Sequence, residues 1–179
     1  MTKILNSNQM DDVLFHEMFR DPPTKYEKIN KKIKLDSKGK LIEKDVNYLT
    51  ANIFYDGTHW AIKSKVVNFA KEWMMQHIQE IPKIEKCKIE ITYHFPTDNF
   101  DLDNKVYFWT KILLDLMKTP SSKQIINAEK YDNEIKTINV LKDDTVRFVD
   151  EINMKYKKGY PAIELKIIGR LEQTQQSLF

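Results

Sequence analysis

The chain of 179 residues predicts an α+β fold in which a small mixed β-sheet packs against two main helices. Apolar residues recur at helical spacing between residues 58 and 81 and again after Asn104. Residues 86–95 instead alternate apolar and polar side chains, which is the period of a strand with one buried face. Beyond residue 142, β-branched and apolar residues predict further strands.

The N-terminal part predicts a short amphipathic helix over residues 7–20, which ends where Asp21 precedes two prolines. We therefore assign residues 1–24 to an N-terminal helical extension, residues 25–170 to the main domain and residues 171–179 to a C-terminal tail. Residues 25–55 predict short strands around a turn at residues 37–40, which include a glycine.

The long helix predicted over residues 58–81 begins at Thr58 as its cap and stops before Pro82. A strand then runs to residue 95, and a second helix begins near Asn104. Residues 119–140 begin as a loop and show no clear period. The last strands form a predicted hairpin that turns at residues 157–160.

Glycine and cysteine counts exclude several chemistries. The four glycines are too far apart to form a phosphate-binding loop or a dinucleotide fingerprint, so phosphate chemistry would depend on side chains or a metal ion. The single Cys87 cannot form an internal disulfide. Because no dinucleotide fingerprint is present, we expect no small-molecule cofactor. The apolar runs are too short to span a bilayer and the N-terminus is too polar for a signal peptide, so we expect a cytoplasmic protein without membrane association.

Two acidic pairs are the most informative residues. Asp101 and Asp103 are two residues apart on an extended segment, which would place both carboxylates on one side. Such a pair favours a hard divalent cation between them. If the strand after Asp143 and Asp144 lies beside the strand at 86–95, a third carboxylate could converge on the same Mg²⁺ ions. From spacing alone, a helix cap at Asp103 and a turn at residues 143–144 are the more frequent explanation.

The order of three motifs shifts that balance toward a metal site. The segment Phe100-Asp-Leu-Asp-Asn104, the helix with Lys111 and Asp115, and the Asp143-Asp144 pair resemble the RusA-like Holliday junction resolvases, the crossover junction endodeoxyribonucleases. The match covers about residues 86–168. The three motifs together, in this order after a strand, are much more specific than any one of them.

The resemblance implies a small homodimeric endonuclease that uses Mg²⁺ to cut four-way DNA junctions by paired symmetric cleavage in recombination and repair. Residue by residue, Asp101, Asp103 and Asp144 match the catalytic, metal-binding carboxylates of the family. The family lysine would fall at Tyr107 here. Lys111, one turn further along, is the candidate catalytic lysine, and Lys105 is the alternative.

Two lysine clusters are candidate contacts to the DNA backbone. Lys31, Lys32 and Lys34 lie in the lysine-rich segment 25–40, and Lys155, Lys157 and Lys158 surround the predicted hairpin tip. Solvated loops explain both clusters nearly as well. Two other functions stay open: a branched or single-stranded DNA-binding protein of the same fold without cleavage, and another D-x-D metal enzyme such as a nucleotidyltransferase.

Overall fold

The computed structural model describes residues 12–29, 35–42, 44–78, 80–98, 101–132 and 134–172. A four-stranded mixed sheet has the order β1-β6-β4-β5, and a small second sheet pairs β2 with β3. The strands are β1 (Asp12–Arg20), β2 (Lys25–Ile29), β3 (Lys44–Tyr48), β4 (Ile84–Phe95), β5 (Val149–Lys158) and β6 (Ala162–Leu171). The helices are α1 (Asn52–Tyr55), α2 (Trp60–His77), α3 (Leu102–Met117) and α4 (Ser122–Tyr131). The predicted α+β class is confirmed.

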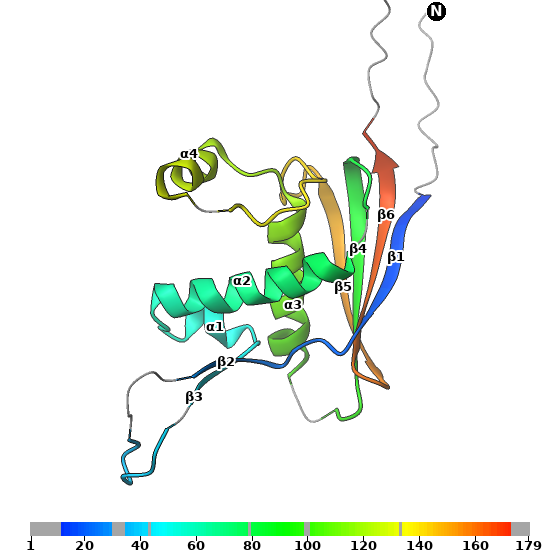
Figure 1. Ribbon diagram of the computed structural model, residues 1–179. Helices are drawn as coiled ribbons and strands as arrows, with labels where there is room; N and C mark the ends of the chain where they lie inside the picture. The colour runs from blue at the N-terminus through cyan, green and yellow to red at the C-terminus, as the bar shows by residue number, and fades with distance from the viewer. Residues whose placement is uncertain are drawn as a thin grey trace, which may run out of the picture.

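The helices α2 and α3 cover one face of the four-stranded sheet, and the described residues leave its other face open (Figure 1). The central strand β4 fits this arrangement because its alternate side chains Cys87, Ile89, Ile91 and Tyr93 are at most 2% exposed. They pack against α3, whose Phe108, Trp109 and Leu113 are equally buried. The alternation predicted for residues 86–95 is confirmed, as is the existence of the two main helices. The predicted cap is wrong, because α2 begins after His59, whose ring accepts the Ala61 amide at 3.2 Å, and not after Thr58.

The N-terminal prediction is wrong over residues 12–20, which form the edge strand β1 and not a helix. Phe15 and Phe19 face the core because this strand pairs antiparallel with β6, opposite Ile167 and Ile163. An irregularity between Val13 and Phe15 breaks the simple alternation, which explains why the sequence imitates a helical period. Residues 1–11 of the predicted extension lie outside the described residues.

The predicted hairpin at the C-terminal end is also wrong. Strands β5 and β6 follow one another in the chain but are not neighbours, because β4 lies between them. β4 pairs parallel with β5 and antiparallel with β6. Residues 159–161 cross over the end of β4, where the Gly159 amide donates a hydrogen bond of 3.1 Å to the Phe95 carbonyl.

Gly169 of β6 is required by the close approach of the neighbouring strand. It lies opposite Asp12 of β1 and Cys87 of β4. A Cβ atom added at this position would lie 2.2 Å from the Lys86 carbonyl oxygen. Because that oxygen belongs to the backbone of β4, any larger side chain would push the two strands apart.

Two peripheral elements complete the fold. The β2–β3 arm projects away from the sheet, and its predicted turn at residues 37–40 is confirmed by the hydrogen bond from the Gly39 amide to the Asp36 carbonyl. Helix α4 begins at Ser122, and its N-cap Ser121 forms a capping box with Gln124. The helix lies within the segment 119–140, for which the sequence showed no clear period. Among the described helices, none is both long and apolar enough to cross a membrane.

Candidate functional site

The first acidic pair lies at the start of α3. Asp101 is the N-cap residue of this helix and Asp103 lies in its first turn, and both are exposed. The Asn104 side-chain amide donates to Asp101 Oδ2 at 3.2 Å, and its backbone amide donates to Asp103 Oδ1 at 2.9 Å. Asn104 therefore holds both carboxylates in place, so the two predicted residues do lie together.

Lysine-bearing segments flank this acidic pair on both sides. The residues that follow β3 contact the first turn of α3, because the Ala51 amide donates a hydrogen bond of 2.7 Å to the Asn104 carbonyl. On the other side, the Tyr156 hydroxyl of β5 donates to the Phe95 and Thr97 carbonyls, both at 3.2 Å, which joins β5 to the loop before α3. The β2–β3 arm, the start of α3 and the β5–β6 turn therefore occupy the same end of the molecule (Figure 1).

Asp144 lies at the other end of α3. Its Oδ2 accepts a hydrogen bond of 3.2 Å from Lys118, the C-cap residue of the helix. The 16 residues of α3 rise about 24 Å, so a helix length separates Asp144 from Asp103. The predicted convergence of the three carboxylates therefore does not occur within one chain.

The direction of β5 explains this separation. β5 does lie beside β4, as the prediction required, but Val149 at its start pairs with Cys87 near the start of β4. Because the two strands are parallel, the residues before β5 lie at the opposite end of the sheet from the residues after β4. Asp144 precedes β5, whereas Asp101 follows β4.

Lys111 is also turned away from the acidic pair. Its ammonium donates to Asp115 Oδ1 at 3.0 Å, one helical turn further toward the end of α3. The same Asp115 oxygen lies 3.1 Å from Lys118, which in turn contacts Asp144. Lys111 and Asp144 thus belong to a separate lysine–aspartate cluster formed by Lys111, Asp115, Lys118 and Asp144. The alternative Lys105 is partly buried, and this burial lowers its pKa.

Asp115 is the central carboxylate of the lysine–aspartate cluster. Burial by itself would raise the pKa of its carboxyl group, but the hydrogen bonds and charges of Lys111 and then Lys118 outweigh burial. The pKa of Asp115 therefore lies below its usual value, and the carboxylate stays ionised in a partly buried position.

Replacing Asp115 by Asn should lower the free energy of unfolding by about 1–3 kcal/mol near neutral pH, because two ammonium groups lose their shared carboxylate. Since the pKa is lower in the folded chain than in the unfolded chain, this stabilisation is complete above the unfolded pKa near 4 and is lost as pH falls through the folded pKa. Urea unfolding of both proteins from about pH 7 to about pH 3 measures the difference, which should shrink below about pH 4.

The exposed Asp132 at the end of α4 offers a matched control. It adopts a left-handed conformation that asparagine also tolerates, so Asp132→Asn should leave the unfolding free energy nearly unchanged. A stability difference between the wild type and Asp115→Asn that is the same at every pH would contradict the assignment.

The structure describes only some of the lysines predicted to contact DNA, and these differ in their surroundings. Lys31, Lys32 and Lys34 lie outside the described residues, whereas Lys38 and Lys40 of the same arm are exposed. Lys155 lies 3.3 Å from Glu90 on the open face of the sheet. Lys157 and Lys158 are exposed at the end of β5, where alternation places Lys157 on the same face as Lys155 and Lys158 on the opposite face. Lys38, Lys40, Lys157 and Lys158 therefore present ammonium groups to solvent.

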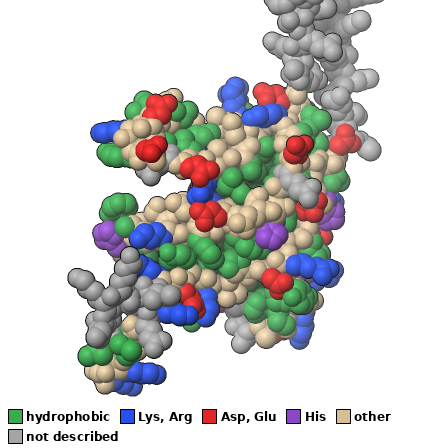
Figure 2. Space-filling view, viewed as in Figure 1, with side chains coloured by type: hydrophobic (Ala, Val, Ile, Leu, Met, Phe, Trp, Pro, Cys, Tyr) green, Lys and Arg blue, Asp and Glu red, His purple; other side chains and the backbone are tan. Residues whose placement is uncertain are grey.

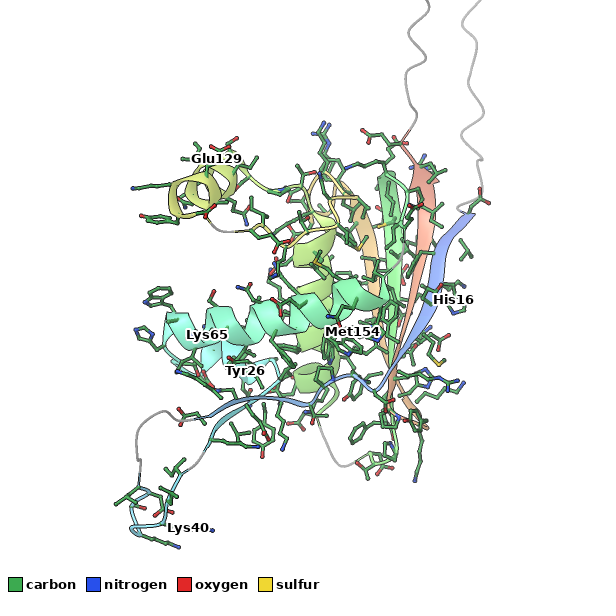
Figure 3. All side chains as sticks on the ribbon, viewed as in Figure 1. His16, Tyr26, Lys40, Lys65, Glu129 and Met154 are labelled. Atoms are coloured by element: carbon green, nitrogen blue, oxygen red, sulfur yellow. The ribbon has the colours of Figure 1, made fainter. Side chains whose placement is uncertain are left out.

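Cys87 and two histidines have structural roles and not catalytic ones. Cys87 is buried, and burial raises the pKa of its thiol to about 12, so its side chain is part of the core and is not a nucleophile. His94 and His16 each contact one oxygen of Glu164 at 2.9 Å and so link β4 and β1 through β6. His16 lies on the side of the sheet away from the helices (Figure 3).

The described residues contain no group of three or more His, Cys, Asp or Glu side chains arranged to hold a metal ion. Asp101 and Asp103 nevertheless provide oxygen ligands of the type that Mg²⁺ prefers. This ion usually keeps several waters and binds through one or two carboxylates together with substrate phosphates. The acidic pair at the start of α3 fits that mode of binding.

No family model matches the chain, and neither the curated proteins nor the solved structures that were compared with it give a match. The similarity to the RusA-like resolvases thus rests on the three sequence motifs alone. Lys71, Lys118 and Lys136 line one cleft together with Asp115, and none of these lysines was a candidate from the sequence. The i, i+4 and i+7 spacing of Lys111, Asp115 and Lys118 was the signal that could have found part of it.

Proposed function

We propose that the chain is a Mg²⁺-dependent endodeoxyribonuclease that cuts four-way DNA junctions, with Asp101 and Asp103 as its metal ligands. The observation that carries this proposal is the position of the acidic pair. Both carboxylates are exposed at the start of α3, at the same end of the molecule as the lysine-bearing arm and the end of β5 (Figure 1). A nuclease needs this combination, because the lysines attract the DNA backbone to the carboxylates that hold the metal.

Each group has a distinct task in this proposal. Mg²⁺, when bound, lowers the pKa of the attacking water and neutralises charge on the phosphate. Asn104 keeps Asp101 and Asp103 oriented through its two hydrogen bonds. Lys157 and Lys158 contact flanking phosphates and position the backbone. Asp144 and Lys111 have no part in the reaction, because they belong to the cluster at the other end of α3.

Symmetric cutting of a four-way junction requires two active sites, so we propose that the protein acts as a C2 homodimer. A fluorescently labelled synthetic junction with Mg²⁺ tests the proposal, with a linear duplex of the same sequence and a reaction containing EDTA as controls. We expect paired cuts in the junction, little cutting of the duplex and none with EDTA. Absence of any cut at saturating protein would overturn the nuclease proposal.

A junction-binding protein without cleavage is the second candidate. It is favoured by the distance of Asp144 from Asp103 and by the ion pair that engages Lys111. Its signature would be tight junction binding without product at any Mg²⁺ concentration. Incorporation of a labelled nucleotide would instead support a nucleotidyltransferase.

A further inference from the structure

A small cleft opens beside the lysine–aspartate cluster, between α2, the end of α3, the start of α4 and residues 135–137. It measures about 60 Å³. Figure 2 shows the molecular surface hollowed between the α4 lobe and α2. Its charged and amide-bearing lining residues include Lys71, Asp115, Lys118, Gln124 and Lys136. Pockets for drug-sized ligands measure about 300–1,000 Å³, so this cleft suits a single small group.

Positive charge dominates the lining. Lys71, Lys118 and Lys136 come from three different segments, and Asp115 is the one carboxylate among the described lining residues. Lys118 and Lys136 have ion-pair partners, but the partners of Lys136 are the exposed Glu72 and Glu134, where solvent screens the attraction. The Lys136 side chain itself is only 19% exposed. The cleft therefore contains the ammonium group of Lys118, which Asp115 and Asp144 hold in place, and that of the largely buried Lys136, whose own ion pairs are weak.

Lys71 is the least satisfied member of the lining. Among the described residues, it makes no hydrogen bond and no ion pair within 4 Å. Burial lowers the pKa of its ammonium, the charge of Asp115 opposes this effect, and the charges of Lys118 and Lys111 lower the pKa further. An anion beside Lys71 would relieve the repulsion among these three ammonium groups.

A neutral donor faces the same space. The Oε1 atom of Gln124 accepts hydrogen bonds from the Ser121 amide at 2.8 Å and from the Ser121 hydroxyl at 2.9 Å. Gln124 lines the cleft, and these two bonds leave its side-chain NH₂ group available to donate to a ligand there. Ammonium groups and an amide NH₂ together match the acceptor oxygens of a tetrahedral oxyanion.

We propose that this cleft binds one phosphate group, with Lys71 as the residue that most requires it. The ligand is inorganic phosphate or the phosphate of a larger molecule such as nucleic acid. The site is about a helix length from the acidic pair, so it does not depend on the proposed nuclease activity and would remain if the chain cut no DNA.

Thermal unfolding and isothermal titration calorimetry with inorganic phosphate test this proposal on the full chain. We expect phosphate to raise the melting temperature of the wild type. Lys71→Met keeps the apolar stem and removes the charge, so it should weaken phosphate binding by about tenfold or more. Because an unpaired, partly buried charge is lost, the variant itself should be no less stable than the wild type.

Lys65→Met is the matched control, since Lys65 is exposed on the same helix (Figure 3). This variant should bind phosphate like the wild type. Equal phosphate affinity in wild type and Lys71→Met, or no phosphate binding by the wild type, would overturn the proposal.

A competition experiment distinguishes the two sources of the phosphate group. If a short single-stranded DNA displaces phosphate and binds more weakly to Lys71→Met, the cleft binds a nucleic-acid phosphate. If phosphate binds at Lys71 and the DNA does not displace it, the ligand is free phosphate or a small phosphate ester. Both outcomes support the site and differ only in its occupant.

Discussion

Replacing Asp103 by Asn should reduce Mg²⁺-dependent cleavage of a four-way junction by about 10²–10³-fold or more, while junction binding stays equal or becomes tighter. The substitution removes one of the two carboxylate charges that hold the metal. The asparagine keeps a side-chain oxygen that can accept the hydrogen bond from the Asn104 backbone amide, which lies 2.9 Å from Asp103 Oδ1 in the wild type. Loss of a negative charge near the DNA backbone explains why binding should not fall.

Single-turnover cleavage and a gel-shift titration on the same preparation measure the two effects of Asp103→Asn separately. Asp132→Asn, an equivalent change at an exposed position on α4, should leave both unchanged. If Asp103→Asn loses binding together with cleavage, Asp103 has a structural role and is not a metal ligand.

Replacing Trp109 by Ala should cost about 3–5 kcal/mol of folding free energy, a large share of the roughly 5–15 kcal/mol of a typical domain. Trp109 is 1% exposed, and its ring centroid lies 5.1 Å from that of Trp73 on α2 and 5.3 Å from that of Phe108. It therefore joins α3 to α2, and α3 carries the acidic pair at one end and the lysine–aspartate cluster at the other.

Urea unfolding followed by circular dichroism measures the effect of Trp109→Ala without dependence on tryptophan fluorescence. Trp60→Ala is the matched control, because Trp60 is 74% exposed at the start of α2 and should change stability by less than about 0.5 kcal/mol. Similar losses in the two variants would contradict the packing described for α3.

The elements that the sequence predicted correctly are those with a strong local period. The β4 strand has four buried side chains in strict alternation, and α3 has an apolar stripe along one side. The N-cap residue of α3 is Asp101 and not Asp103, which the sequence offered as a cap. Strand β1 was predicted as a helix because its partner β6 is far away in the sequence and its apolar residues also fit a helical spacing. The pairing of β1 with β6 determines the conformation of residues 12–20, and no pattern within those residues indicates that pairing.

The candidate site was predictable in part for the same reason. Asp101 and Asp103 are close in sequence, so local geometry alone places them together. The position of Asp144 depends on whether β5 runs parallel or antiparallel to β4. The sequence pattern predicts a strand there but does not predict the direction in which it pairs. Strand β5 lies beside β4 as expected, but the insertion of β4 between β5 and β6 and the parallel pairing of β4 with β5 place Asp144 beside Lys118.

We propose that Asp101 and Asp103 at the start of α3 bind the metal without Asp144. Single-turnover cleavage of a four-way junction by the Asp144→Asn variant tests this directly. We expect single-turnover cleavage by Asp144→Asn to stay within about threefold of the wild type, while Asp101→Asn and Asp103→Asn show almost none. Thermal unfolding of each variant ensures that folded proteins are compared. An Asp144→Asn protein that is folded, binds junctions and is as inactive as Asp103→Asn would contradict the account.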